Sequence, residues 1–458
     1  MGSENIFYDA PGKFQNTRFE RIHNVTFPSA AEASKLVAEE IATGIRSCIN
    51  KPYILGLATG SSPIGVYKEL VSLHKKEGLS FKNVITFNLD EYFPIQRDDL
   101  LSYNHFMSYH LFDHIDIPKE NINIPEGDIS SKDIYSYCNE YEKKINDLGG
   151  LDFQLLGIGR TGHIGFNEPG ANKNSVTRLV SLDFITKEDA AGDFNGIDNV
   201  PDKAITMGVY SIMRAKRIVL LAWGHKKSKK VAKSIEGPIS SMVPASFLQA
   251  HNNTSIILDE EASSELTRYK TPWLVTDCKW TDSLRKKAIA WLCNKLQKPI
   301  LKLTQRDYNE NGLSDLLETK GSGYELNIWM FNQLQRSITG WPGGKPNHSD
   351  ENRPERAVPA KKRVLIFSPH PDDDVISMGG TLARLIDQNH EVYVAYQTSG
   401  NIAVSDEDAR RYVDVSIATS GDSKKMNNLK LELANKKEGT IDSNELNKLK
   451  GDIRKSEC

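Results

Sequence analysis

Short apolar runs recur along the N-terminal part of this 458-residue chain, and segments with helical periodicity separate them. Runs of this length, bounded by glycine, proline and polar residues, predict buried strands. They are residues 53–58, 84–89, 153–156, 218–223 and 255–258. Strands that alternate with helices form a mostly parallel sheet that helices cover on both faces. The sequence therefore predicts an α/β fold, a three-layer αβα domain with a doubly wound sheet.

A glycine-rich loop, residues 157–170, follows the third of these strands and carries His163 and Glu168. Glycines allow the backbone to approach a ligand closely. A histidine titrates near neutral pH, and a neighbouring carboxylate can orient its ring for proton transfer. The alternative is a glycine-rich turn whose histidine has only a structural role.

The loop after the first strand is short, polar and followed by a helical pattern that starts near Ile64. It consists of Thr59, Gly60, Ser61 and Ser62. Pro63 suits the first helical position and Ser62 the N-cap, so backbone N–H groups at the start of the helix would form a phosphate site. The alternative is a plain strand–turn–helix connection.

Charged residues follow two further strands, at the edge where parallel sheets bind ligands. Asp90 comes after residues 84–89, where a partly desolvated carboxylate could act as a base or, alternatively, cap a helix. Glu91 is interpreted as supporting it, and His105 and His110 are assigned to packing or the surface. Lys227, in the first turn of the helix after residues 218–223, opposes the helix dipole, which an anion held nearby would explain.

The loop sequence, GIGRTGHIGFNEPG, resembles the signature of the glucosamine-6-phosphate deaminases, and the similarity extends over roughly residues 23 to 290. This resemblance implies conversion of glucosamine 6-phosphate to fructose 6-phosphate and ammonia, without a metal or an organic cofactor. His163, oriented by Glu168, would open the sugar ring, and Asp90 would remove the C2 proton. The phosphate would be held by Thr59, Gly60, Ser61, Ser62 and Lys227. The resemblance also implies self-association into a homo-oligomer.

Some positions depart from the family pattern. Thr161 stands where the family usually has an aspartate, and a threonine forms hydrogen bonds but carries no charge. Residues 178–180, Arg-Leu-Val, lack the lysine that serves allosteric activation in some members. Two rival functions therefore stay open. One is a related sugar-phosphate isomerase or lactonase on the same fold, and the other is a noncatalytic sugar-phosphate sensor.

A proline-rich stretch, residues 341–362, predicts a linker between domains. The segment after it, 363–458, contains a predicted strand, helix and second strand. Its SPHPDDD sequence resembles the LmbE-like zinc-dependent de-N-acetylases, which implies zinc ligation by His370 and Asp373 and a base at Asp372. The family needs a further histidine downstream, and none follows His390, so we expect a truncated, incomplete second α/β domain with an incomplete zinc site.

The remaining parts complete the expected organisation: an N-terminal extension over residues 1–22, the deaminase-like domain over 23–290, and a helical extension over 291–340. A net charge of -2 and 39% hydrophobic residues indicate an ordinary globular protein without a nucleic-acid or membrane partner. The five cysteines are scattered, without C-x-x-C spacing, which fits a reducing cytoplasm. No apolar run approaches the length of a membrane span.

Overall fold

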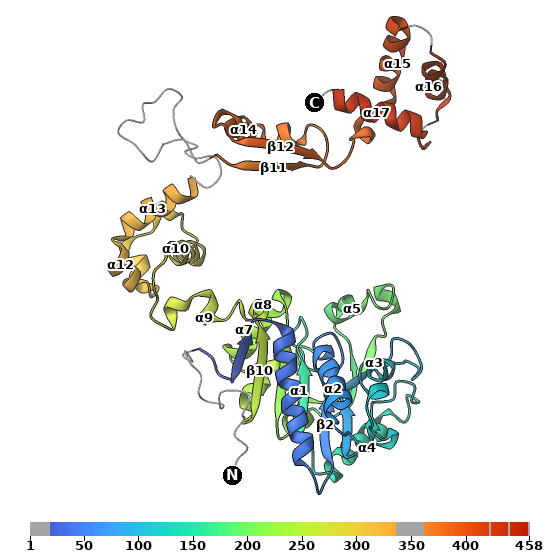
Figure 1. Cartoon of the computed structure of the whole chain (residues 1–458), viewed down its shortest axis with the longest axis vertical. Coiled ribbons are helices and arrows are strands. Elements are labelled where there is room, and N and C mark those ends of the chain that lie inside the picture. The colour runs from blue at the N-terminus through green and yellow to red at the C-terminus, as the bar shows by residue number, and fades with distance from the viewer. Residues whose placement is uncertain (1–18, 336–360, 421–422, 438–439, 457–458) are drawn as a thin grey trace. The chain divides into compact units, whose positions relative to one another are not determined.

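The computed structural model describes residues 19–335, 361–420, 423–437 and 440–456. The chain divides into two compact units, Met1–Lys279 and Trp280–Cys458. Figure 1 shows the first unit in blue to yellow-green and the second in yellow to red. Within the described residues, no helix combines the length and the apolar character that crossing a membrane requires.

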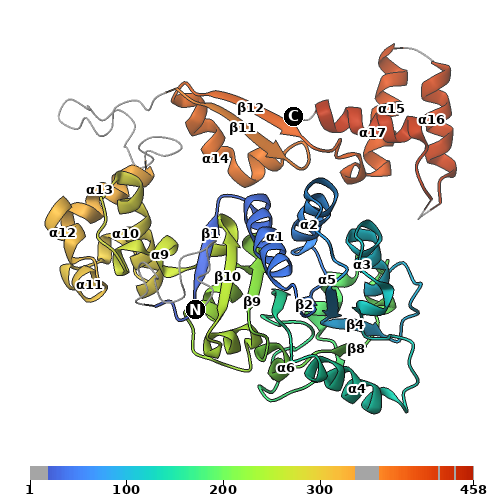
Figure 2. The same ribbon diagram turned by 60° about the horizontal axis from the view of Figure 1, so that its bottom comes forward.

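A sheet of seven strands forms the centre of the first unit, and every neighbouring pair in it is parallel. Its order is β1 (Asn24–Phe27), β10 (Thr254–Asp259), β9 (Ile218–Ala222), β6 (Phe153–Gly157), β2 (Tyr53–Leu57), β3 (Val84–Asn88) and β5 (Ile122–Asn123). Figure 2 shows β1, β10 and β9 side by side. All five strands predicted from the apolar runs are confirmed, with ends that differ by at most one residue.

Alternate strand residues pack into two separate cores, one on each face of the sheet. Leu55 and Leu57 of β2 belong to one core, whereas Ile54 belongs to the other. The first core includes residues of α1 (Ala30–Ser47), α2 (Ile64–Glu77) and α3 (Tyr103–His110), and α1 and α2 lie in front of the sheet in Figure 1. The second includes residues of α4 (Ile134–Asp147), α6 (Val209–Met213), α7 (Ser228–Ile235) and α8 (Glu260–Ser263). The predicted three-layer αβα architecture is confirmed.

A second, smaller sheet lies next to the end of β3. It is antiparallel and has the order β4 (Asp90–Phe93), β8 (Lys203–Thr206) and β7 (Arg178–Ser181). The sequence places Asp90 at the carboxyl end of a strand, and the structure adds a new strand that begins at this residue. Asp90 therefore lies at the junction of two sheets, where backbone pairing with Thr206 fixes its position.

The N-terminal segment that the sequence describes as an extension is partly built into the first unit. Residues 1–18 lie outside the described residues. Ile22 is 5% exposed and packs into the second core, and Glu20 forms an ion pair with Arg268 at 3.2 Å. Residues 19–22 therefore belong to the packed domain.

The second unit begins with a group of helices. They are α10 (Asp282–Leu296), α11 (Gln305–Glu310), α12 (Ser314–Lys320) and α13 (Gly323–Gln335). The expected domain boundary at residue 290 falls inside α10, whereas the division into units lies between Lys279 and Trp280. Residues 341–360 of the expected linker lie outside the described residues.

The C-terminal segment contains the predicted strand–helix–strand element. β11 (Arg363–Ser368) pairs in parallel with β12 (Glu391–Tyr396), and α14 (Asp373–Asp387) connects them. Three further helices follow, α15 (Asp406–Ser420), α16 (Lys424–Asn435) and α17 (Asn444–Ser456), around their own apolar cluster.

Candidate active site

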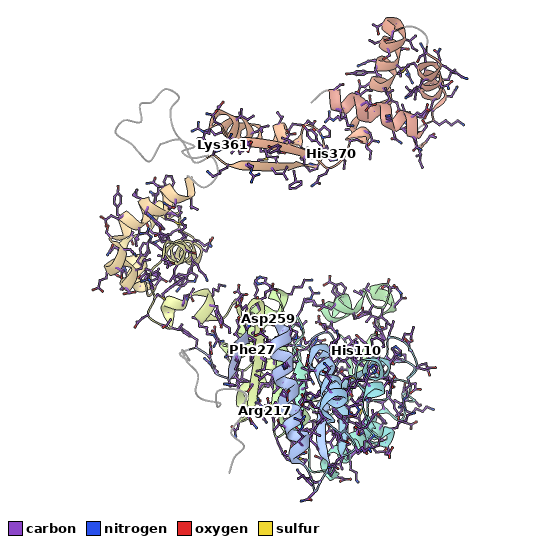
Figure 3. All side chains as sticks on the ribbon, in the orientation of Figure 1. Phe27, His110, Arg217, Asp259, Lys361 and His370 are labelled. Carbon is purple, nitrogen blue, oxygen red and sulfur yellow. The ribbon has the colours of Figure 1, made fainter. Side chains whose placement is uncertain are left out.

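A cavity of about 1180 Å³ opens at the carboxyl ends of the central strands, where loops after β2, β3, β6 and β9 form its walls. In Figure 3, Asp259 marks the carboxyl end of β10, and Arg217, which precedes β9, marks the opposite end of the sheet. Most residues that the sequence predicts as functional line this cavity, namely Thr59, Gly60, Ser61, Ser62, Asp90, His163 and Lys227. Glu168 does not line it but contacts His163.

His163 and Glu168 form a half-buried pair in the loop after β6. The Nδ1 atom of His163 lies 3.0 Å from Oε2 of Glu168, and the two side chains are 16% and 13% exposed. Burial raises the pKa of Glu168, but the hydrogen bond and charge of His163 outweigh this effect and leave it below its usual value. An ionised carboxylate only accepts hydrogen bonds, so Nδ1 donates. Nε2 is therefore the ring nitrogen that remains for proton transfer.

Two threonines hydrogen-bond to this pair, each at a different oxygen of Glu168. The hydroxyl of Thr161 donates to Oε2 of Glu168 at 3.0 Å, and the hydroxyl of Thr186 donates to Oε1 at 2.5 Å. Both hydroxyls also lie close to Nδ1 of His163, at 2.9 and 3.3 Å. Thr186 belongs to α5 (Phe184–Ala190), so this helix takes part in orienting the pair.

Glycines bring the loop close to the other parts of the site. A Cβ atom on Gly159 would lie 2.1 Å from Nε2 of His163, so only glycine leaves room for the ring in this position. Gly165 has a φ of +54°, and its Cβ would lie 3.3 Å from Oδ2 of Asp90. The loop that carries His163 therefore also contacts Asp90.

Asp90 is a buried carboxylate on the wall of the cavity. It is 5% exposed. Burial, together with the neighbouring charge of Glu91, raises the pKa of Asp90 to about 8. A carboxylate with such a pKa can accept a proton from carbon near neutral pH, because its basicity is far greater than that of an exposed aspartate.

Glu91 points to the start of α3. Its carboxylate accepts hydrogen bonds from the backbone N–H groups of Tyr92, Tyr103 and Asn104, at 2.9, 2.9 and 3.1 Å. Burial raises the pKa of Glu91 to about 7 in spite of these three bonds. Glu91 thus fixes the start of α3 and the backbone beside Asp90.

The cavity wall also carries a hydroxyl and an ammonium group, those of Ser62 and Lys227. Nζ of Lys227 donates to Oγ of Ser62 at 3.0 Å, and Trp223 donates to the carbonyl of Ser62, also at 3.0 Å. The predicted role of Ser62 as a helix cap is wrong: α2 starts at Ile64 with Pro63 at its N-cap position and no side-chain cap, because the Ser62 hydroxyl is engaged with Lys227. A cation, a hydroxyl and the backbone of the loop at Gly60 together suit an anion.

A family model identifies the protein family to which the chain belongs. The model of the glucosamine-6-phosphate isomerases/6-phosphogluconolactonases matches residues 28–257, which is half of the chain. The chain belongs to this family.

Individual relatives agree with this assignment. A protein of Bacteroides thetaiotaomicron that is named only as glucosamine-6-phosphate deaminase-like is 50% identical over 453 residues, which cover 96% of this chain and 68% of the relative. A glucosamine-6-phosphate deaminase of Oceanobacillus iheyensis is 46% identical over 234 residues, 51% of this chain and 92% of that protein. A solved structure of a monomeric glucosamine-6-phosphate deaminase is 42% identical, with a TM-score of 0.51, and covers 53% of this chain and 99% of that protein.

The C-terminal segment matches a second model, that of the GlcNAc-PI de-N-acetylases, over residues 365–454, so the resemblance stated for it is confirmed. His370, labelled in Figure 3, has its Nδ1 atom 2.8 Å from Oδ2 of Asp373, and Asp372 forms an ion pair with Arg454. In the part of the chain that the structure describes, no three histidine, cysteine or acidic side chains gather as a metal site. His370 and Asp373 alone do not fit zinc, which takes at least three protein ligands.

Several residues that line the cavity of this isomerase/lactonase family member were not singled out by the sequence. Thr186 and Asp189 come from α5, which lacks a sequence motif, and Arg160 lies inside the motif at a position without an assigned role. His105 and His110, assigned to packing or the surface, also line the cavity. A signal for Arg160 existed, since an arginine between the glycines of a ligand-binding loop points to an anion.

Proposed function

We propose that this chain converts glucosamine 6-phosphate and water to fructose 6-phosphate and ammonia. The observation that carries this proposal is that three features meet at one cavity. They are the buried carboxylate of Asp90 with its raised pKa, the His163–Glu168 pair, and an anion-binding site that contains the ammonium group of Lys227. The relatives named as glucosamine-6-phosphate deaminases support the choice of substrate.

Proton transfers by positioned side chains suffice for the reaction. His163, through Nε2, takes the proton of the C1 hydroxyl and returns one to the ring oxygen, which opens the pyranose. Glu168 stabilises the ring of His163 while it carries the extra proton. Asp90 then removes the C2 proton of the open-chain sugar to give an enolamine.

The later steps complete the balance of atoms. Protonation at C1 converts the enolamine to a C2 imine, and water adds to C2 and expels ammonia, leaving the ketone of fructose 6-phosphate. Lys227, the Ser62 hydroxyl and the loop from Thr59 to Ser61 hold the phosphate. Binding of this remote group keeps C1 and C2 beside Asp90 and His163.

Asp90 argues for an enzyme over a sensor. Burying a carboxylate is unfavourable, and a protein that only binds a sugar phosphate has no need of a base on the cavity wall. A lactonase or an isomerase on the same fold would use the same anion site but would release no ammonia.

The test is formation of ammonia and fructose 6-phosphate from glucosamine 6-phosphate by the full chain and by Asp90→Asn. We expect turnover by the full chain and a loss of at least 1000-fold in the variant, which keeps the shape of the side chain but removes the base. Asp202→Asn is a matched control, because this carboxylate is 83% exposed, pairs with Lys187 and does not line the cavity. Its turnover should be unchanged.

Other outcomes identify the rivals. Ketose formation without ammonia would indicate an isomerase. Hydrolysis of 6-phosphogluconolactone by a chain that releases no ammonia from the amino sugar would indicate a lactonase. Binding of the sugar phosphate without any turnover would indicate a sensor.

A further inference from the structure

A second cation, Arg160, lies on the wall of the cavity in the loop between β6 and His163. Its side chain is 35% exposed and pairs with two carboxylates of α5, Glu188 at 2.5 Å and Asp189 at 2.6 Å. Arg160 and Asp189 both line the cavity, and Glu188 does not. Arg160 therefore lies at the wall of the cavity, and α5 supplies both of its carboxylate partners.

Asp189 interacts with both Arg160 and Lys227. Its carboxylate contacts Nε of Arg160 and also acts electrostatically on the ammonium of Lys227. Lys227 in turn donates to the hydroxyl of Ser62. An acidic side chain of the protein thus occupies a position that two cations make favourable for an anion.

The ion pairs of Arg160 are easily exchanged. The side chains of Glu188 and Asp189 are 55% and 45% exposed, and ion pairs at such exposed sites contribute little to stability. A phosphate monoester brings up to two charges and three acceptor oxygens to the cavity. The planar guanidinium group binds such oxygens in a bidentate manner.

We propose that Arg160 determines specificity for the phosphate group, exchanging Asp189 for a phosphate oxygen and holding the ligand together with Lys227 and Ser62. The identification of the ligand as a sugar phosphate rests on the proposed function. The helix α5 stays attached to the loop when Arg160 changes partner, because Thr186 still donates to Glu168. The His163–Glu168 pair therefore keeps its geometry while the phosphate is bound.

The experiment measures binding of inorganic phosphate and of fructose 6-phosphate to the full chain by calorimetry at constant ionic strength. Arg160→Gln should lower the affinity for each of the two ligands by roughly 10- to 100-fold. Arg160→Lys keeps the positive charge but loses the planar, bidentate guanidinium group, so it should lower these affinities less. With glucosamine 6-phosphate as substrate, Arg160→Gln should raise KM by a similar factor and leave kcat within about threefold. Lys187→Ala is the matched control, since this cation of α5 pairs with Asp202 and does not line the cavity.

A double variant, Glu188→Gln with Asp189→Asn, separates phosphate binding from attachment of α5. It removes the partners of Arg160 and leaves Arg160 in place, so phosphate affinity should be equal or higher. The proposal is overturned if Arg160→Gln binds inorganic phosphate as tightly as the natural chain, or if the double variant loses as much affinity as Arg160→Gln. Because binding requires no turnover, a chain that releases no ammonia but loses phosphate affinity in Arg160→Gln would refute the proposed function and leave this inference intact.

Discussion

At the scale of single residues, the hydroxyls of Thr161 and Thr186 stabilise the charge of Glu168 without adding a charge of their own. Each donates one hydrogen bond to the carboxylate, from the loop and from α5 respectively. A threonine in place of the aspartate that the resemblance leads one to expect therefore has a physical role. It keeps Glu168 ionised and avoids a second negative charge beside it.

Replacement of Thr186 by valine tests this role. The pKa of Glu168 should rise, because a hydrogen bond to its ionised form is lost while its burial stays the same. The proposed base Asp90, whose pKa is raised to about 8, sets the acidic limb of the kcat profile, so the pKa of Glu168 has to be followed directly. The measurement is NMR titration of the Glu168 carboxyl carbon, in which the valine variant should titrate at higher pH than the natural chain. Thr186→Ser retains the hydroxyl and should behave as the natural chain, and equal titration curves for valine and serine would exclude the role.

Asp90 should make folding stability dependent on pH. Its pKa is raised from 3.8 in the unfolded chain to about 8 in the folded protein, chiefly by burial. Between these values the folded protein holds a proton that the unfolded chain has released, so its contribution to stability is complete below about pH 4 and is lost as pH rises through 8.

Asp90→Asn removes this dependence. The variant should equal the natural chain in unfolding free energy near pH 4 and exceed it at pH 8 by on the order of 1–3 kcal/mol. Urea unfolding at the two pH values measures the difference. If Asp90→Asn stabilised the protein equally at pH 4 and at pH 8, ionisation of Asp90 would not be the cause of the stabilisation.

At the scale of elements, Gly165 fixes how the glycine-rich loop meets β4 and β8. Its φ of +54° suits glycine, and a Cβ atom would lie 2.9 Å from Oγ1 of Thr206 and 3.3 Å from Oδ2 of Asp90. Oγ1 of Thr206 also accepts the backbone N–H of Phe166 at 3.0 Å. An added methyl group would therefore displace both the loop and the carboxylate.

Gly165→Ala should lower kcat/KM at least 100-fold, because small displacements of reacting groups are costly. Gly170→Ala is the matched control in the same loop: its φ of +96° imposes at least as much backbone strain as that of Gly165, on the order of 1 kcal/mol or more, but its Cβ would meet nothing within 4 Å. Steady-state kinetics and thermal unfolding of both variants separate the two effects. Equal losses of activity would attribute the effect of Gly165→Ala to strain alone.

The sequence predicts the elements better than it predicts their junctions. Strand positions follow from apolar runs, since a strand buried on both faces needs apolar residues throughout. The predicted role of Ser62 as a helix cap was wrong because that prediction considers only neighbouring residues, whereas the Ser62 hydroxyl accepts a hydrogen bond from Lys227, which is distant in the sequence. Thr186 and Asp189 could not be found, because α5 reaches the loop only through tertiary contacts.

At the scale of the whole molecule, the division between Lys279 and Trp280 separates the proposed catalytic machinery from the rest of the chain. Every lining residue of the cavity precedes this division. Trp280 is 5% exposed and donates to Asp315 at 2.5 Å, so it belongs to the packing of the second unit. Self-association stays a prediction from the resemblance, and the solved relative is described as monomeric.

A chain that ends at Lys279 should therefore fold and keep its activity. The solved deaminase aligns over 99% of its own length with only 53% of this chain, so a protein of that size forms a stable fold in the family. We expect cooperative thermal unfolding and a kcat within about threefold of the full chain. Ending the chain at Asn253 is the contrasting variant: it removes β10, which lies between β1 and β9, and should abolish cooperative unfolding because two strand interfaces are lost. A folded but inactive chain ending at Lys279 would show that the second unit contributes to the site.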